Sequence, residues 1–219
     1  MADGFHPPVE EYLEAIYQLE EEGVAVIRAR LAERLAHSAA AVTEMVRRLI
    51  DEGFVEVEDR SLRMTPEGRR RAESVVRKHR LAERLLTDVI GLPWHKTHLE
   101  AGRWEHVMSD EVEGRLVALL ENPTTCPHGN PIPGSGVRVQ PLRPLSTAEP
   151  GERIRLERVA ETVEIDLDTL TYLDAHGFRP GADAEVRDKA PDGALTLDLG
   201  SETIAVSPSL AEQLFVGRL

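Results

Sequence analysis

The feature that most restricts the fold of this chain is the segment 78–110, in which histidine and glutamate recur at helical spacing. The pattern predicts two helices joined at 91–93, because Gly suits a helix C-terminus and Pro suits the first turn of the next helix. His79 and Glu83 lie four positions apart and share one face of the first helix. One stripe of the second helix carries His98, Gly102, Glu105 and His106. Imidazole and carboxylate groups that converge from adjacent helices predict a site for a first-row divalent cation.

Each of these side chains, taken alone, also fits a solvated helix face. Taken together they are interleaved with apolar residues, namely Leu81, Leu85, Leu86, Leu99 and Val107. A metal site is therefore a better interpretation of the whole set than a group of solvated surface side chains.

The bulk composition limits the class of protein. The chain has 219 residues, 41% of them hydrophobic, which suffices for one large domain or two to three small ones. No apolar run reaches the roughly 18 residues of a membrane span, and the N-terminal residues lack the basic and apolar regions of a secretory signal. The single cysteine, Cys126, excludes an intrachain disulfide and fits a reducing compartment. We therefore expect a cytoplasmic protein without a membrane partner.

Charge is unevenly distributed along the chain. The net charge of −13 argues, by itself, against nucleic acid as a partner. Between Arg28 and Arg48, however, five arginines accompany only two glutamates. A basic face on an acidic protein is thus compatible with DNA binding.

Residues 1–64 have the pattern of a winged helix-turn-helix domain. Apolar positions recur at helical spacing over 8–22, about 28–36 and 39–51. Alternating residues then flank 59–61 and predict a β-hairpin. Helix, short helix, turn, helix and hairpin is the order of elements in winged DNA-binding domains.

Residues 65–140 predict a helical domain. Thr65 provides an N-cap for a long helix over 66–90, and Pro follows it at the first helical position. Further helices are expected over 94–108 and 110–122. This unit is too long to be only an extension of the winged domain.

The remaining chain has a different character. The stretch 123–150 holds seven of the fourteen prolines and predicts an irregular connector or tether. Short alternating stretches follow, and 166–177 predicts a short amphipathic helix. Strands of this length and spacing suggest a small β-barrel in residues 141–219. The expected fold class is therefore mainly α with a small β domain.

Five stretches of the chain resemble one family. RARLAERL, EDRSLRMTPEGR, RKHRLAERLLTDVIGL, RWEHVMSDEVE and GNPIPG are similar to segments of the metal-dependent repressors of the diphtheria toxin repressor type. The resemblance implies an N-terminal winged helix-turn-helix, a helical dimerisation domain and a C-terminal SH3-like (FeoA-like) β-barrel. It also implies a homodimeric transcription factor that binds operator DNA, an inverted repeat, when loaded with Mn²⁺ or Fe²⁺.

The resemblance further implies two metal sites. An ancillary site is implied at His79, Glu83, His98 and Glu164. A second ligand from the third domain is implied near Leu167 or Asp168, where the family's glutamine is replaced. The primary site is implied at Glu11, Gly102, Glu105 and His106.

The primary site departs from that of iron-type members at two positions. Their methionine aligns with Glu11 and their cysteine with Gly102, so position 102 offers only a carbonyl or a bound water. The oxygen and nitrogen donors that remain favour Mn²⁺ over softer cations, with Fe²⁺ as the alternative. Glu14 resembles the second acid of manganese-type members, although a solvated carboxylate is the preferred interpretation of Glu14 alone.

Cys126 stands where iron-type members have serine, and His128 follows two residues later. Cys-x-His beside Glu83 resembles the second site of streptococcal manganese regulators. This implies an alternative ligand set of Glu83, Cys126, His128 and an acid from the β domain. An inert buried thiol is the other interpretation of Cys126.

The helix over 39–51 is the expected DNA reader. The residues at or near its N-terminal end, which enters the major groove in such domains, are Ser38, Ala41, Thr43 and Glu44. Ala41 suits a thymine methyl group, and Glu44 can accept from cytosine N4 but repels phosphate. The expected phosphate contacts are Arg28, Arg30, Arg48 and Arg60.

Three other functions compete with DNA regulation. One is a winged-helix module for protein interaction, which the clustering of basic residues disfavours. A metal-dependent hydrolase would fit the His/Glu set, but the chain has no HExxH motif, nucleophile elbow or phosphate loop. A thiol redox sensor would depend on Cys126 without a second cysteine to resolve it. We therefore expect no enzyme but a transcriptional repressor, with metal-uptake genes as its targets.

Overall fold

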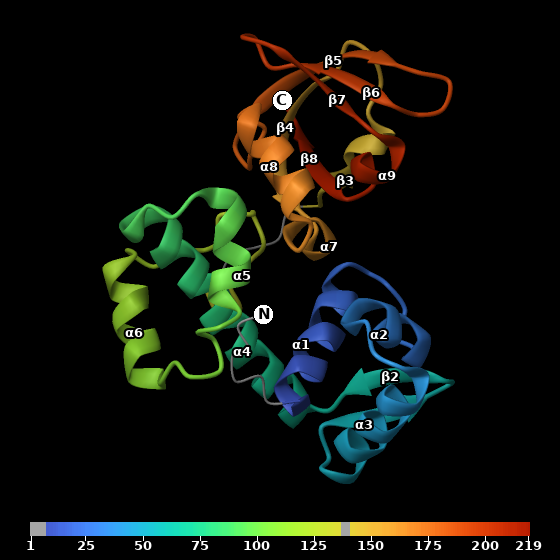
Figure 1. Ribbon diagram of the computed structural model, residues 1–219, viewed down its shortest axis with the longest axis vertical. Coiled ribbons are helices and arrows are strands. Elements are labelled where there is room, and N and C mark those ends of the chain that lie inside the picture. Colours follow the sequence, from blue (N-terminus) through green and yellow to red (C-terminus); the bar gives the residue numbers. More distant parts are fainter. Residues whose placement is uncertain (1–7, 137–140) are drawn as a thin grey trace.

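The chain folds into three units that follow one another along the sequence and meet near helix α4 (Pro66–Arg84) (Figure 1). The computed structural model describes residues 8–136 and 141–219. The predicted domain ends at residues 1 and 140 thus lie outside the described residues. Within the described ranges, none of the helices combines the length and the apolar content of a membrane span.

The N-terminal unit is a winged helix-turn-helix, as predicted. Its elements are α1 (Pro8–Glu21), α2 (Arg28–Leu35), α3 (Ala39–Asp51) and the hairpin strands β1 (Val55–Glu58) and β2 (Ser61–Met64). Leu13, Ile16 and Leu49 are fully buried in its apolar core. Ser38 fixes the start of α3 because its hydroxyl accepts from the Ala41 N–H.

The central unit is helical but contains less regular helix than predicted. Its elements are α4, the π-helical η1 (Leu85–Ile90), the 3-10 turn η2 (Trp94–Lys96), α5 (Thr97–Ala101) and α6 (Asp110–Leu119). Thr65 caps α4 as expected by accepting from the Gly68 N–H. The helix predicted over 94–108 is wrong, because α5 ends at Ala101 and irregular turns follow. Gly102, with its low helix propensity, stands at this end.

The proline-rich connector is packed rather than free. Over 123–136 the structure has no helix and a single isolated bridge, between Thr125 and Pro131. Cys126, His128 and Ile132 are nevertheless buried. Of the two predicted alternatives, an irregular connector is therefore confirmed for this part of the chain, and a free tether is wrong.

The C-terminal unit is an antiparallel sheet with short helices beside it (Figure 1). Its strands, in spatial order, are β3 (Arg143–Pro144), β8 (Leu214–Arg218), β4 (Arg153–Val159), β5 (Asp183–Lys189), β6 (Leu195–Asp198) and β7 (Thr203–Val206). The short helical elements are η3 (Leu145–Thr147), α7 (Glu161–Glu164), α8 (Leu167–Ala175) and α9 (Pro208–Ala211). The core between them includes Phe178 and Leu156, and it also receives Trp94 from the central unit.

The FeoA-like unit is confirmed, but the predicted barrel does not close. Among the described residues, β3 and β7 stand at the two ends of the strand order, so the sheet is open. Strand β3 is only two residues long, and its Pro144 has no N–H to donate. The outer edge of β7 is covered by Tyr172, whose hydroxyl donates to the Ala205 carbonyl at 2.9 Å and accepts from the Ala205 N–H at 3.3 Å. A tyrosine thus satisfies backbone groups that a closing strand would have paired.

Candidate metal centre

The candidate centre is built on one face of α4. His79 and Glu83 lie one helical turn apart and are 4% and 0% exposed. Such groups need partners, because burying an unpaired charge is costly. Their partners come from the segment after α5, from the connector and from α5 itself, while α7 reaches the same space.

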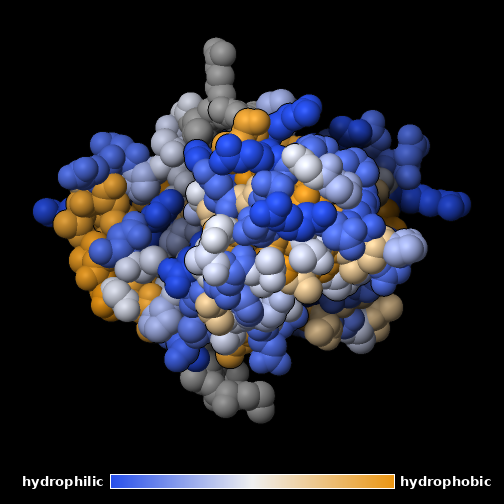
Figure 2. Space-filling model, turned by 90° about the horizontal axis from the view of Figure 1, so that it is seen from above, coloured by the Kyte–Doolittle hydropathy of each residue, from blue (hydrophilic) through white to orange (hydrophobic). Residues whose placement is uncertain are grey.

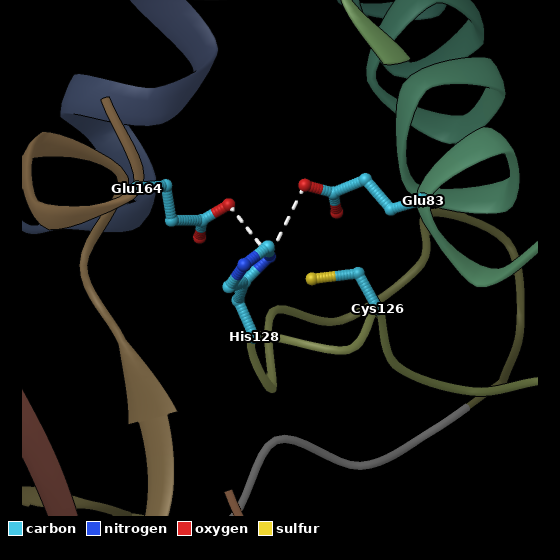
Figure 3. A group of neighbouring side chains, drawn as sticks. All are labelled: Glu83, Cys126, His128 and Glu164. Atoms are coloured by element: carbon cyan, nitrogen blue, oxygen red, sulfur yellow. Dashed lines mark ion pairs between the residues drawn. The ribbon is translucent and has the colours of Figure 1, made fainter. Parts of the chain in front are cut away.

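Four buried side chains form what we call the closed cluster: Glu83, Cys126, His128 and Glu164 (Figure 3). One ligand atom of each lies within 4.8 Å of the others. His128 Nδ1 is 3.1 Å from Glu83 Oε1 and 3.1 Å from Glu164 Oε2. The carboxylates approach the imidazole from opposite sides, from α4 and from α7, and the Cys126 thiol points into the same space (Figure 3).

Several atoms of the closed cluster have no hydrogen-bond partner among the described residues. They are Glu83 Oε2 and both ring nitrogens of His128, although Nδ1 lies 3.1 Å from one carboxylate oxygen of Glu83 and one of Glu164. Buried polar atoms are rarely left in this state. Two carboxylates, an imidazole and a thiol with uncommitted lone pairs fit a divalent cation.

A second group, the pocket cluster, lines a cavity of about 290 Å³ where residues of all three units meet. Its members are Glu14, His79, His98, Glu105 and Glu161. They form two overlapping triplets, each with ligand atoms within 4.8 Å of one another, and His79 belongs to both. His79 Nδ1 contacts Glu105 Oε2, and His79 Nε2 lies 3.1 Å from His98 Nδ1. The Nδ1 atom of His79 thus faces the triplet that contains Glu105, and its Nε2 atom faces the triplet that contains His98.

Glu83 connects the two clusters. Its Oε1 lies 3.3 Å from His79 Nε2, 3.3 Å from His98 Nδ1 and 3.1 Å from His128 Nδ1. His98 also reaches Glu164 Oε2 at 3.1 Å. The imidazoles and carboxylates therefore form one continuous network across the centre.

The other predicted primary ligands lie at the edge of the pocket. His106 Nδ1 is hydrogen bonded with Glu10 Oε2 at 2.9 Å, and its Nε2 lies 3.0 Å from Glu105 Oε1. Glu11 and Gly102 line the cavity itself. A Cβ added at Gly102 would meet its nearest neighbour at 3.8 Å, so there is room for a side chain at this position.

The groups of the centre shift one another's pKa values. Burial and the charge of Glu105 raise the pKa of Glu14 to about 8. Burial and the charge of Glu164 raise the pKa of Glu161 to about 7. Burial lowers the pKa of His98, but its hydrogen bonds with Glu164 and Glu83 and the charge of Glu161 together outweigh this effect, and the pKa rises to about 10. The pocket therefore retains protons at neutral pH, and a divalent cation can take their place.

The Cys126 thiol is held in its neutral form. Burial and the charge of Glu83 raise the pKa of this thiol to about 12. A thiol that is protonated and 1% exposed is a poor nucleophile. Its conversion to a thiolate requires the compensating charge of a bound cation.

The structure brings together most of the predicted ligands, but not all of them. Asp168 is exposed on α8, outside the three groups of metal-ligating side chains found among the described residues. Glu161 and Glu10 are absent from the predicted set, and Glu14 lies in the pocket rather than in solvent. A signal existed for Glu161, which precedes Glu164 by three residues and so shares its helix face.

The predicted DNA-binding residues are all exposed on the N-terminal unit. Those on and before α3 are Ser38, Ala41, Thr43 and Glu44, and the arginines are Arg28, Arg30, Arg48 and Arg60. Arg48 is paired with Glu52 at 2.6 Å. Arg47, absent from the predicted set, lines the same surface hollow as Arg28 and Thr43. Its spacing of four from Thr43 was the available signal.

Three family models match the chain. Residues 5–61 match the N-terminal DNA binding domain of the iron dependent repressors, and residues 65–134 match their metal binding and dimerisation domain. Residues 143–218 match the FeoA domain.

Known proteins are similar over nearly the whole chain. The diphtheria toxin repressor of Corynebacterium diphtheriae is 44% identical over 220 residues, which are 96% of each chain. The iron-dependent repressor IdeR of Mycobacterium tuberculosis is 44% identical over 224 residues, also 96% of each. A solved manganese-dependent transcriptional repressor in complex with manganese has a TM-score of 0.86 at 29% identity, with 96% of this chain and 100% of that chain covered. The structure of ScaR with bound Zn²⁺ has a TM-score of 0.81 at 29% identity, over 97% and 100% of the two chains.

Proposed function

The chain belongs to the diphtheria toxin repressor family of metal-dependent transcriptional repressors, and we propose that it represses its promoters when the pocket cluster holds Mn²⁺ or Fe²⁺. The homologues form a non-enzymatic family of repressors, so neither a hydrolase nor a redox sensor is favoured. Genes for metal uptake are the proposed targets, and the cytoplasm, where the DNA is, is the proposed location.

The observation that carries this proposal is the meeting of α1 with the central unit. Glu14 belongs to the unit with the DNA-binding face, whereas His79 and Glu105 belong to the central unit, and their ligand atoms lie within 4.8 Å of one another. When these residues hold one cation in common, the angle between the two units is fixed. The population shifts toward the DNA-competent arrangement by no more than the difference in metal affinity between the two arrangements.

We assign the pocket ligands by their place around the cavity, as Glu11, Glu14, His79, His98, Glu105, His106 and Glu161, with a carbonyl or water at Gly102. A bound divalent cation would supply the positive charge that these facing carboxylates lack. All donors are oxygen or imidazole nitrogen, which suits Mn²⁺ first and Fe²⁺ second. The names of similar structures include manganese, zinc and cadmium complexes.

We propose the closed cluster as a second metal site. Its four side chains saturate a tetrahedral ion without leaving a position for a substrate, which is typical of a structural site. Glu83 from α4 and Glu164 from α7 belong to different units, so a shared ion would hold the C-terminal unit against the central unit. Asp168 is not part of this proposed set.

The proposed active form is a homodimer on an inverted repeat. Six large hydrophobic side chains of the central unit are exposed: Val89, Ile90, Leu99, Val107, Val112 and Leu119. An apolar patch appears at the left edge of Figure 2, the side on which Figure 1 draws α5 and α6. An exposed patch of this kind supports a second copy as its partner. We propose domain limits of 1–64, 65–140 and 141–219 for the protomer.

A binding experiment tests the proposal. A duplex selected by the Mn²⁺-loaded protein from a random DNA library is titrated with protein while fluorescence anisotropy is followed. We expect tight binding with Mn²⁺ or Fe²⁺, and loss of binding when EDTA is added. Equal affinity with and without EDTA would contradict metal control, and hydrolysis of the duplex would contradict a repressor.

A further inference from the structure

The connector carries two side chains of the closed cluster in a short turn rather than in a regular helix or strand. In this turn the Cys126 N–H donates to the Asn130 carbonyl at 2.8 Å, and the Gly129 N–H donates to the Cys126 carbonyl at 3.0 Å. Cys126 and His128 lie in the stretch 123–136, whose only bridge joins Thr125 and Pro131 among the residues that the structure describes. Buried carbonyl groups nevertheless need hydrogen-bond donors. Proline cannot supply an N–H, and the carbonyls of Thr125, Pro127, Pro131 and Pro133 accept from side chains outside the segment.

Arg84 of α4 supplies donors next to Cys126. Its Nε donates to the Thr125 carbonyl at 2.7 Å, and its guanidinium also donates to the Cys126 carbonyl at 3.2 Å. The same guanidinium reaches the Thr125 hydroxyl at 3.3 Å. The planar guanidinium group of an arginine can donate to several acceptors at once. The ammonium group of a lysine, at the end of a flexible side chain, does not reproduce this geometry.

Two more arginines on the same face of α4 repeat this contact further along the connector. Arg80 donates to the Pro131 carbonyl at 2.5 Å, and Arg77 donates to the Pro133 carbonyl at 2.6 Å. Spacings of three and four residues place all three arginines on one stripe of the helix. The three arginines of this stripe therefore donate to successive carbonyls along the connector.

Trp94 contacts the connector next to His128. Its Nε1 donates to the Pro127 carbonyl at 3.0 Å, and its ring centroid lies 4.8 Å from that of His128. The indole is 4% exposed and belongs to the core of the C-terminal unit. Trp94 therefore limits both the backbone before His128 and the orientation of the imidazole.

The opposite side of the connector lies against β4. The His128 carbonyl accepts from the Val159 N–H at 2.9 Å. Gly129 has a φ of +88°, and a Cβ there would lie 1.9 Å from the Glu157 carbonyl oxygen, so only glycine permits this approach. The connector is thus clamped between the backbone of β4 and side chains of the central unit.

We propose that Arg84 and Trp94 are positioning residues for Cys126 and His128: they supply hydrogen bonds that the short backbone turn lacks and hold the thiol and the imidazole where the closed cluster requires them. This inference rests on the proposed role of the closed cluster as a metal site. One of its two tests is therefore carried out on metal-free protein.

The first test measures how firmly the connector is held without metal. Cys126 is the only cysteine, so the rate at which a chromogenic disulfide reagent labels EDTA-treated protein reports its exposure. We expect Arg84→Lys to raise this rate about tenfold, the factor that corresponds to loss of one charged hydrogen bond. Trp94→Phe, which keeps an aromatic ring but loses the donor to Pro127, should raise it about threefold. Arg70→Lys is the matched control, since Arg70 is exposed on the same helix.

The second test uses Co²⁺ as the probe. Wild-type protein at saturating Co²⁺ should show the thiolate-to-cobalt charge-transfer absorption of Cys126. Arg84→Lys should weaken this absorption and shift its titration to higher Co²⁺ concentration about tenfold, whereas Arg70→Lys should match the wild type.

The outcomes separate the two proposals. Absence of the charge-transfer band in the wild type would overturn the metal assignment of Cys126, whatever the labelling rates are. A band in the wild type together with unchanged labelling and Co²⁺ titration in both Arg84→Lys and Trp94→Phe would overturn the positioning role alone. Equal acceleration by Arg70→Lys would also overturn it, because the effect would then be a general loosening of α4.

Discussion

The closed cluster and the pocket cluster share one face of α4 but differ in what they join to it. The closed cluster contains buried side chains from α4, the connector and α7, and none from the N-terminal unit. The pocket cluster includes Glu14 of α1 and borders a cavity of about 290 Å³. Both clusters therefore link the central unit to the C-terminal unit, through Glu164 and Glu161, but only the pocket cluster also reaches the unit that carries the DNA-binding face.

This difference suggests that the two clusters have different functions although their side chains are chemically similar. A site with four buried ligands on three elements suits permanent occupancy and structural support. A site beside a cavity, with a ligand from the unit that carries the DNA-binding face, suits reversible occupancy and a shift of population. The following predictions test this division of tasks, beginning with the largest expected effect.

Glu105→Ala should abolish metal-dependent operator binding, with a loss of affinity of about a hundredfold or more. Glu105 contacts both His79 and His106, so its removal takes a carboxylate from the centre of the pocket cluster. Anisotropy titrations with Mn²⁺ measure the effect, and Glu202→Ala, at an exposed position, is the control. Operator binding that survives in Glu105→Ala would show that the pocket cluster is not the switch.

Cys126→Ser should reduce operator affinity by about tenfold at most, because the closed cluster supports the fold rather than the angle of the DNA-binding unit. The number of tightly bound metal ions per protomer should fall by one, as measured by elemental analysis after dialysis. A loss as large as that of Glu105→Ala would erase the distinction between the clusters.

Gly102→Cys should change metal selectivity by several-fold in favour of Co²⁺ and Zn²⁺ over Mn²⁺, since a thiolate is a softer donor. A Cβ at this position meets no atom closer than 3.8 Å, so the fold should tolerate the substitution. Competition titrations between Mn²⁺ and Co²⁺ measure the shift, and Gly102→Ser, of similar size without the sulfur, is the control. An identical shift in both variants would argue against thiolate ligation in the pocket.

Glu14→Gln should have the smallest effect, with opposite signs in the two states of the protein. Burial and the charge of Glu105 raise the pKa of Glu14. A carboxyl whose pKa is raised on folding costs stability above its ordinary pKa, because the unfolded chain releases the proton more readily. The substitution should thus stabilise metal-free protein at pH 7 by about 1 kcal/mol while it weakens Mn²⁺ binding. Thermal unfolding with EDTA and with Mn²⁺ measures both, and lower stability in EDTA would contradict the prediction.

Local patterns predicted the helical elements of the N-terminal unit closely. The expected helices over 8–22 and 39–51 are found at Pro8–Glu21 and Ala39–Asp51, because apolar periodicity and caps such as Ser38 act within a few residues. The helix expected over 94–108 is wrong for the opposite reason. Its apolar and ligand residues continue the helical spacing, but the helix ends at Ala101, and the low helix propensity of Gly102 alone does not determine where a helix ends.

The predicted ligand sets depended on the same distinction. His79 and Glu83 lie on one helix, so their common face followed from their spacing. The positions of Glu10, Glu14 and Glu161 depend on how α1 and α7 approach α4, and a solvated carboxylate cannot be told from a buried one until that approach is known. For this reason Glu14 was expected in solvent and Asp168 near the metal, whereas the structure has Glu14 in the pocket and Asp168 exposed.

The sequence by itself determined the order of the three units, the donor types available for a metal and the absence of a thiol at position 102, since these follow from residue identity and local spacing. Only the tertiary structure decided that the proline-rich connector is packed, that the β unit is an open sheet, and which carboxylates face the imidazoles. The physical reason is the distance along the chain over which each interaction acts. Helix periodicity and capping act over one or two turns, whereas the environment of a charged side chain depends on elements that are distant in the chain and are brought together by burial of apolar surface.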